Sequence, residues 1–233
     1  EKTDVVDLGL DVNLFGSLSL TFDYYNKLTH GILYRNPIPY VNGGLGAPMI
    51  NSAKVRNRGF EFSAFYNKNF GDLGFAVSVN GAYNRNEIID YKGDYLEING
   101  ATVWTEGQPI GKFYMREIDH IVQDKAEIDK LVSEGWTFSP SRPEPGDFLY
   151  KDLNNDKRID DKDRVLKGQP LPLFTFGGSI AFSYKNFDLS ALFSGVSGWD
   201  RYLSTGIFSL TNADTERLFL KKFQNQWSET NRN

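Results

Sequence analysis

The sequence predicts an all-β fold, an antiparallel segment of a transmembrane β-barrel. Apolar and polar residues alternate with a period of two in several runs, which is typical of strands with one apolar face. Short and long connections alternate along the chain, as in outer-membrane barrels with short periplasmic turns and long extracellular loops. Aromatic residues gather where the runs meet the short connections, as in the interfacial girdles of such barrels. They are Phe15, Phe70, Phe75, Tyr184 and Phe187.

Six runs are predicted to be strands. Residues 4–14 and 18–25 flank a turn at 15–17. Residues 60–67 and 75–84 flank a tight turn at 71–74, and together they predict an antiparallel hairpin. A second clear hairpin is predicted for 174–184 and 187–194, around the turn at 185–186.

The long connections are predicted at 35–53, 89–172 and beyond residue 198. The first is rich in proline and glycine, which favour loops. The second contains a predicted strand at 111–122 and a predicted helix at 124–134 that ends at Gly135. A last helix is predicted at 214–227. We therefore expect one partial barrel domain over 1–233, with 89–172 as a long extracellular insertion.

Apolar and polar residues also alternate along the strands of a soluble β-sandwich, which is the alternative interpretation. The polar face of a sandwich would carry many Lys, Glu and Thr residues, whereas here it carries Ser, Ala, Asn and Gly with few charges. The alternative protein would be a calcium-stiffened sandwich that binds carbohydrate at the cell surface. The apolar stripes in 174–184 and 187–193 discriminate, because a barrel exposes them to lipid and a sandwich buries them.

Composition narrows the function classes. The chain has 233 residues, 40% of them hydrophobic and 15% aromatic, and a net charge of −4, which gives no electrostatic case for nucleic acid. It has no cysteine, which excludes disulfides, thiolate metal sites and cysteine nucleophiles. It has no apolar run of transmembrane-helix length and no signal peptide at its start. Its first and last residues suggest a piece of a longer chain.

An acidic stretch has the spacing of a calcium loop. Side-chain oxygens fall at loop positions 1, 3, 5, 9 and 12, and position 7 would offer its backbone carbonyl, a pattern that suits a hard cation such as Ca²⁺. In that order the candidate ligands are Asp152, Asn154, Asp156, Asp160 and Asp163, with Arg158 at position 7. We predict a structural Ca²⁺ that stiffens this loop and takes no part in catalysis.

Two departures weaken the match to the EF-hand pattern. Lys157 stands where a glycine normally makes the sharp turn, and Asp163 replaces the bidentate glutamate. A solvated acidic turn is the alternative, because Asn and Asp favour turns with or without metal. A further alternative is an adhesion or scaffold module that docks through this loop.

Catalytic constellations are not expected. The two histidines are His30 and His120. Asp119 precedes His120, but neighbours on a strand point to opposite faces, so a hydrogen-bonded or exposed histidine is expected rather than a dyad. No Gly-x-Ser-x-Gly nucleophile elbow occurs between a strand and a helix. The sequence predicts no enzyme.

Several stretches together carry a family resemblance. They are DYYNK at 23–27, Asn51 followed by RNRGFE at 56–61, YNRNE at 83–87, EGQPIGKFY at 106–114, YKDLNNDKRIDDKDR at 150–164, GQP at 168–170 and FTFG at 174–177. In this order the chain resembles the SusC/RagA-type TonB-dependent outer-membrane transporters of the Bacteroidetes group. Family members commonly have glycines in the acidic loop, where this chain has Asn155 and Lys157.

The resemblance implies a barrel of 22 antiparallel strands in the cell outer membrane, of which this chain would be a part of the C-terminal half. The plug domain and the TonB box would lie outside this chain. It also implies import of oligosaccharides or peptides, driven by TonB through the missing N-terminal part. A SusD-like lipoprotein would cover the extracellular mouth, and outer-membrane lipid would surround the wall.

Overall fold

The computed structural model describes residues 1–35, 48–90, 97–202 and 227–232, and everything below refers to them. The chain divides into two compact units. The first comprises Glu1–Lys112 and Gly168–Asp200, and the second comprises Phe113–Lys167 and Arg201–Asn233. Each unit is described by itself. No helix in the described ranges is long and apolar enough to cross a membrane.

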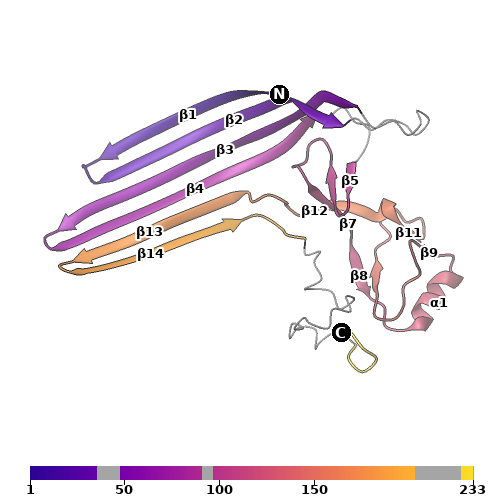
Figure 1. The fold of residues 1–233 in the computed structure, drawn as a ribbon. Helices are drawn as coiled ribbons and strands as arrows, with labels where there is room; N and C mark the ends of the chain where they lie inside the picture. Colours follow the sequence, from indigo (N-terminus) through magenta and orange to yellow (C-terminus); the bar gives the residue numbers. More distant parts are fainter. Residues whose placement is uncertain (36–47, 91–96, 203–226, 233) are drawn as a thin grey trace. The chain divides into compact units, whose positions relative to one another are not determined.

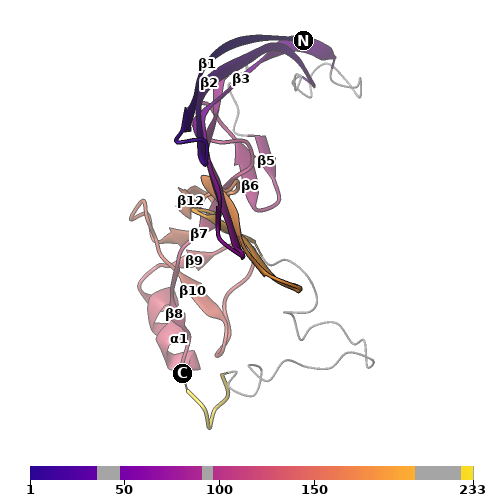
Figure 2. The same ribbon diagram turned by 90° about the vertical axis from the view of Figure 1, so that its left-hand side faces the viewer.

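A six-stranded antiparallel sheet dominates the first unit (Figure 1). Its order is β1-β2-β3-β4-β13-β14, so neighbours in the chain are neighbours in the sheet except across the insertion between β4 and β13. The strands are β1 (Lys2–Leu14), β2 (Leu18–Arg35), β3 (Met49–Phe70), β4 (Leu73–Asp90), β13 (Phe174–Tyr184) and β14 (Phe187–Ser197). Seen from the side, the sheet is curved and twisted (Figure 2).

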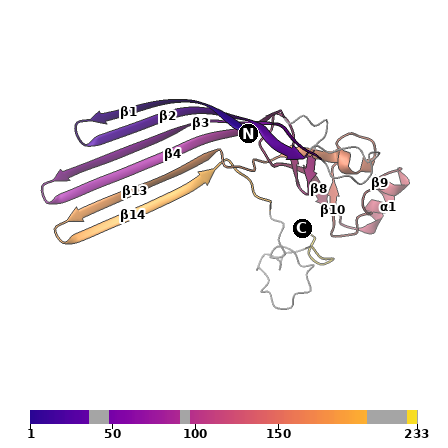
Figure 3. The same cartoon turned by 45° about the horizontal axis from the view of Figure 1, so that its top comes forward.

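The three short turns lie at one end of this sheet (Figure 3). Phe15, Gly16, Gly71 and Lys185 in these turns have positive φ angles, the conformation that tight hairpins with matching strand twist require. The turn between β3 and β4 is tighter than predicted, with Gly71 and Asp72 alone outside the strands. The long connections leave from the opposite end, as the sequence predicted.

Strands β2, β3 and β4 are longer than the alternation predicted. The predicted loop at 35–53 is wrong at its end, because β3 begins at Met49, well before Phe60. Residues 54–58 carry charged or amide side chains at several positions, so the apolar–polar pattern is lost while the ladder with β4 continues. A regular backbone ladder needs no apolar face when the strand leaves the hydrophobic region.

The register places apolar side chains on one face of all six strands. Directly opposed residues in antiparallel pairs share a face. One row reads Leu8–Tyr24–Phe60–Tyr83–Phe174, the next Leu10–Phe22–Phe62–Gly81–Phe176, and the row nearest the turns Phe70–Leu73–Tyr184–Phe187. The sequence pattern and the ladder thus agree on one apolar face.

Aromatic rings cover the glycines on this apolar face. A side chain at Gly81 would meet the ring of Phe62 at 2.5 Å, and one at Gly195 would meet the ring of Phe176 at the same distance. Phe193 covers Gly178 in the same way. Such pairing restores the packing that a glycine in a strand lacks.

The opposite face is mostly polar and hydrogen-bonded across strands, although Phe65 and Leu192 also lie on it. Thr21 donates to Asp11 at 2.7 Å, and the hydroxyls of Ser78 and Ser179 lie 2.9 Å apart. The ring of Tyr25 crosses Gly59, and its hydroxyl donates to Asn84 at 3.0 Å. Small residues in this region let the side chains of neighbouring strands meet.

At the end away from the turns, a small core forms within the first unit. Ala53, Val55 and Ile88 are buried, and Ile32, Trp104 and Ile110 pack against them. Trp104 belongs to a hairpin formed by β5 (Glu97–Asn99) and β6 (Thr102–Trp104). The buried Asn86 donates to Asn57 at 2.9 Å and accepts from the backbone N–H of Ile110.

The second unit has its own core of Val122, Ile128 and Leu149, against which Leu131 and Phe138 pack. Its elements are β7 (Lys112–Arg116), β8 (Ile118–Ile121), α1 (Lys125–Ser133), β9 (Thr137–Phe138), β10 (Phe148–Tyr150), β11 (Arg158–Ile159), a 3-10 turn (Asp161–Asp163) and β12 (Arg164–Lys167). β7 pairs with β12, β8 with β10, and β9 with β11.

The predicted surface helix is confirmed. Asp124 caps α1 by accepting from the N–H of Glu127, and Gly135 follows with a φ of 92°. The single strand predicted at 111–122 is wrong, because Glu117 separates β7 from β8. The Glu117 carboxylate accepts hydrogen bonds from Lys167, at the end of β12, and from Lys151, just after β10. These two bonds lower the pKa of Glu117. The helix predicted at 214–227 lies outside the described residues except for Trp227.

Candidate functional site

The apolar face has the height of a membrane core. Phe60 and Phe70 on β3 are ten residues apart, and so are Phe174 and Tyr184 on β13. Tyr83 of β4 pairs with both Phe60 and Phe174, and Leu73 of β4 pairs with both Phe70 and Tyr184, so the two spans have the same height. At a rise of ~3.4 Å per residue and a tilt of about 40°, ten steps cover about 25 Å along the membrane normal. That is the height of the outward apolar band of outer-membrane barrels.

Side chains on this face are exposed. Phe187 is 79% and Leu189 69% exposed on β14, and Phe176 and Phe182 on β13 are each 38% exposed. A sandwich would bury these stripes under a second sheet, and no described element covers them. The exposure favours the barrel over the soluble alternative. Strands β1 and β14 lie at the two sheet edges, so the described sheet is an open wall.

The model of a protein family described as "TonB dependent receptor-like, beta-barrel" matches residues 1–224. The chain belongs to this family. The predicted antiparallel barrel segment, the predicted outer-membrane location and the resemblance to TonB-dependent transporters are thereby confirmed. The strand count of 22 and the place of the chain within the barrel stay predictions.

Two curated relatives come from Formosa agariphila. TonB-dependent receptor P3 is 31% identical over 245 residues, which cover 100% of this chain and 24% of that protein. TonB-dependent receptor P39 is 27% identical over 237 residues, which cover 87% of this chain and 22% of that protein. The chain therefore spans about a quarter of the length of the relatives it matches.

Solved structures share the fold. The RagAB peptide transporter matches with a TM-score of 0.65 and 24% identity, over 84% of this chain and 21% of the other. The RagAB peptide importer in its "open-open" state gives a TM-score of 0.66 at 22% identity, over 84% and 20%. These similarities confirm the RagA-type barrel fold.

The acidic loop folds as a tight series of turns between β10 and β12. Asp152 accepts from the backbone N–H groups of Asp156 and Lys157, at 3.2 and 2.8 Å. Asn154 accepts from the same N–H of Asp156, and Asp156 accepts from the N–H of Arg158 at 2.9 Å. These hydrogen bonds bring the first three predicted ligands close together, with Asn154 and Asp156 exposed.

Lys157 occupies the position that a glycine normally takes, with a φ of 60°, and its backbone carbonyl accepts from the N–H of Thr137. Its ammonium donates to the carbonyl of Glu134 at 3.0 Å. The strained backbone of a non-glycine residue is therefore held from both sides by the segment that follows α1.

The second half of the loop is bound by its own neighbours. Asp160 forms an ion pair with the Nε of Arg158 at 2.9 Å. Asp163 is completely buried and accepts from the N–H groups of Leu153 and Asp160, at 2.9 and 2.8 Å. Within the described residues, no three acidic or histidine side chains converge as metal ligands.

The donor set nevertheless fits a hard cation in type, because it consists of carboxylate, amide and carbonyl oxygens. The carboxylates accept N–H groups with some of their lone pairs and retain others, since each oxygen has two. A cation would require Asp160 to exchange Arg158 for the metal. The spacing of residues 152–163 therefore correctly predicted the position of an ordered acidic loop. That Ca²⁺ binds in this loop stays a prediction.

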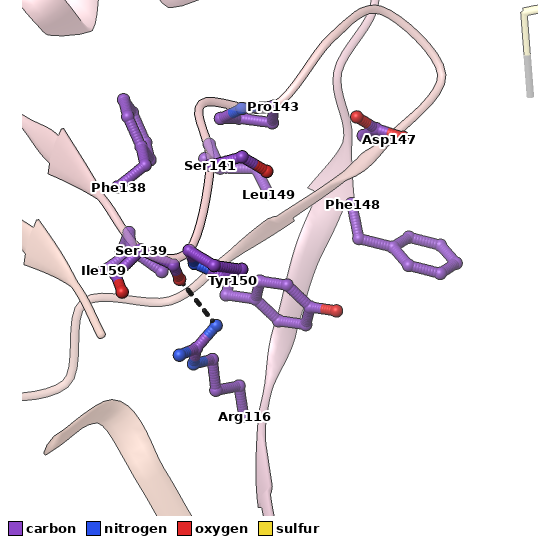
Figure 4. A pocket seen from close by; sticks show the side chains of 11 residues that line it. Arg116, Phe138, Ser139, Ser141, Pro143, Asp147, Phe148, Leu149, Tyr150 and Ile159 are labelled. Atoms are coloured by element: carbon purple, nitrogen blue, oxygen red, sulfur yellow. Dashed lines mark hydrogen bonds between the residues drawn. The ribbon is translucent and has the colours of Figure 1, made fainter. Parts of the chain in front are cut away.

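Arg116 anchors this loop, and sequence reasoning missed it. It donates to the carbonyls of Asp160 and Ser139, at 2.9 and 3.0 Å, and pairs with Asp161. Figure 4 shows its guanidinium aimed at Ser139 beneath Tyr150, in a shallow pocket of about 210 Å³. Two of its three hydrogen-bond partners among the described residues are backbone carbonyls, which leave no signal in a sequence.

His120 links β8 to α1 through side-chain hydrogen bonds. Its ring nitrogens lie 2.8 Å from Asp119 and 2.5 Å from Glu127. The hydrogen bond to Glu127 and then that to Asp119 raise the pKa of His120. The predicted hydrogen-bonded histidine is confirmed, but the reason given for separating it from Asp119 is wrong, because the two side chains meet near the end of β8.

Proposed function

We propose that the protein to which this chain belongs imports oligosaccharides or peptides across the outer membrane, with TonB as the energy source. One observation carries the proposal: an apolar face about 25 Å high is backed by a face of mostly hydroxyl, amide and small side chains. A wall of this kind separates lipid from a polar interior. Membership of the TonB-dependent receptor family supports TonB as the energy source.

A SusD-like lipoprotein is the proposed partner at the outer mouth. The connection between β4 and β13 is long and leaves from the sheet end opposite the short turns, which is the extracellular end by the rule for outer-membrane barrels. The RagAB structures, named as a peptide transporter, support a peptide as one of the two substrate classes.

Uptake in whole cells tests the import proposal. Labelled oligosaccharide and peptide mixtures are given separately to the parent strain, to a strain lacking this gene and to a strain lacking TonB. We expect uptake of one mixture to fall to background in both mutants and to return when the full-length gene is restored. Unchanged uptake of both mixtures without the gene would contradict the proposal.

We also propose that the 152–163 loop binds one structural Ca²⁺ through Asp152, Asn154, Asp156, Asp160, Asp163 and the carbonyl of Arg158. The hydrogen bonds that hold the first three side chains close together support this proposal. The cation would offset the charge of the clustered carboxylates and stiffen the turns, a structural role.

Metal content tests the calcium proposal. The double variant Asp152→Ala/Asp156→Ala, purified as the full-length transporter, is expected to lose about one bound Ca²⁺ per chain in elemental analysis. Asp129→Ala is the matched control, because it removes a carboxylate of α1 that pairs with Arg142 outside the loop. Equal calcium content in the wild type and the double variant would show that the loop binds no metal.

A further inference from the structure

Two arginines lie side by side just beyond the apolar band of the sheet. Arg58 of β3 is directly opposite Arg85 of β4, and the pair follows the aromatic pair Phe60 and Tyr83 on the same face. The side chain of Arg58 is 44% exposed, and Arg85 is exposed. Like charges directly opposite one another destabilise a sheet. A bound anion between the two guanidinium groups would remove this repulsion.

The charge of this arginine cluster is only partly balanced. Arg56 lies two residues further along the same face, opposite Glu87, and Glu87 pairs with Arg58 at 3.8 Å. Three arginines and one carboxylate leave a net charge of +2. The Nε of Arg56 is buried and has no hydrogen-bond partner among the described residues. Turning this guanidinium toward an anion would therefore break no hydrogen bond at Nε.

A hollow beside Arg85 offers space for such an anion. It has a volume of about 280 Å³ and is lined by Tyr83, Arg85, Gln108, Lys112 and Gln169 among others. It opens where β4 extends beyond the first residue of β13, between the backbone bonds from Asn84 to Leu173 and from Ile88 to Gln108. The hollow adds a second cation, Lys112, and two side-chain amides close to the exposed arginine.

From these observations we propose that Arg58 and Arg85, supported by Arg56, bind the phosphorylated headgroup of an outer-leaflet lipid. The cluster continues the lipid-facing surface, since it shares the face of Phe60 and Tyr83 and follows the row at which that surface ends. Aromatic rows mark the boundary between hydrocarbon and headgroups, and basic side chains next to them attract anionic headgroups. The assignment to the outer leaflet rests on the proposed orientation, with the long connections outside.

Arginine suits this ligand better than lysine would. Its planar guanidinium offers two parallel N–H groups to phosphate oxygens, and two guanidiniums on neighbouring strands can hold one phosphate from both sides. The strand separation of ~4.8 Å places them at a suitable spacing for one phosphate group. The lipid would then link β3 to β4 at the upper rim of the wall.

Lipid phosphate in the purified protein tests the inference. The full-length transporter is extracted from outer membranes in mild detergent, and bound lipid is measured by organic extraction and phosphorus assay and by native mass spectrometry. Arg58→Gln/Arg85→Gln is expected to lose tightly bound phospholipid or phosphoglycolipid about tenfold. Arg58→Lys/Arg85→Lys should retain a substantial part, and if the double glutamine variant does not assemble, Arg85→Gln alone is measured.

Lys130→Gln/Lys162→Gln is the matched control, because these two lysines lie on α1 and on the 3-10 turn and not on the sheet. It should retain the lipid. Equal lipid content in the arginine variant and the wild type would overturn the inference, as would phosphorus that dialysis removes as free phosphate. Loss of lipid with normal uptake separates this inference from the import proposal, whereas a wild-type protein absent from the outer membrane would defeat the orientation on which both rest.

Discussion

Replacing Ile180 by lysine in the full-length transporter is expected to destabilise the barrel by about 2–4 kcal/mol, the cost of a basic side chain at the middle of the lipid face. Ile180 lies on the apolar face of β13, between Val77 of β4 and Ala191 of β14. Its position is four residues from Tyr184 and six from Phe174, near the middle of the band. The free energy of unfolding in urea, measured in lipid vesicles, checks this.

Ala181→Lys is the matched control. Ala181 is the next residue on the same strand, but it points to the polar face, opposite Ala76 and Ser190. A lysine there stays in a polar environment and is expected to cost less than half as much as at Ile180. Equal destabilisation by both variants would contradict the assignment of the two faces.

Gly59→Ala is expected to destabilise the sheet by about 3 kcal/mol or more, at the upper end of the cost of overpacking. A methyl group at Gly59 would lie 1.8 Å from the backbone oxygen of Tyr83 and 2.9 Å from the hydroxyl of Tyr25. The clash with backbone cannot be relieved by a rotamer change. β3 and β4 would have to separate locally, and the hydrogen bond from Tyr25 to Asn84 would be strained or lost.

Gly177→Ala provides the comparison on the same polar face. A methyl group there meets its nearest neighbours, Asn80 and the backbone of Phe193, at 3.4 Å, which is ordinary contact. We expect a change in the free energy of unfolding below about 1 kcal/mol. If Gly59→Ala proved as mild as Gly177→Ala, the close approach of β3 and β4 at this point would be wrong.

The strands that cross the apolar band could be read from the sequence because lipid and interior impose opposite polarities on alternate residues. Residues 174–184 were predicted with the bounds that β13 has. The alternation fails outside the band, which explains why the first part of β3 was missed. There the ladder persists through backbone hydrogen bonds, to which the side chains of Lys54 and Asn57 give no clue.

The acidic loop was located by the spacing of its oxygen-bearing side chains, because that spacing follows from the turn geometry itself. Its anchoring was not predictable. Arg116 binds carbonyls that belong to residues distant in the chain, and any residue could supply them. The burial of Asp163 was equally hidden, since it depends on how the loop folds over the 3-10 turn.

The arginine cluster could be recognised only from the strand register. Arg58 and Arg85 stand 27 positions apart in the sequence (85 − 58), and both lie outside the strand runs that showed a clear alternation, apart from the family resemblance. The pairing of β3 with β4 makes them neighbours, and the aromatic pair beside them fixes their place relative to the apolar band.

The most direct test of the account is a spin-label scan along β13 of the full-length protein in lipid vesicles. This chain has no native cysteine, so single cysteines can be introduced at 175, 176, 179, 180, 181 and 182 without interference from it. We expect labels at the even positions to be accessible to oxygen dissolved in lipid, and those at the odd positions to face a polar environment. Even positions that are packed in a water-soluble core, with no alternation, would contradict the barrel wall and the transport function proposed from it.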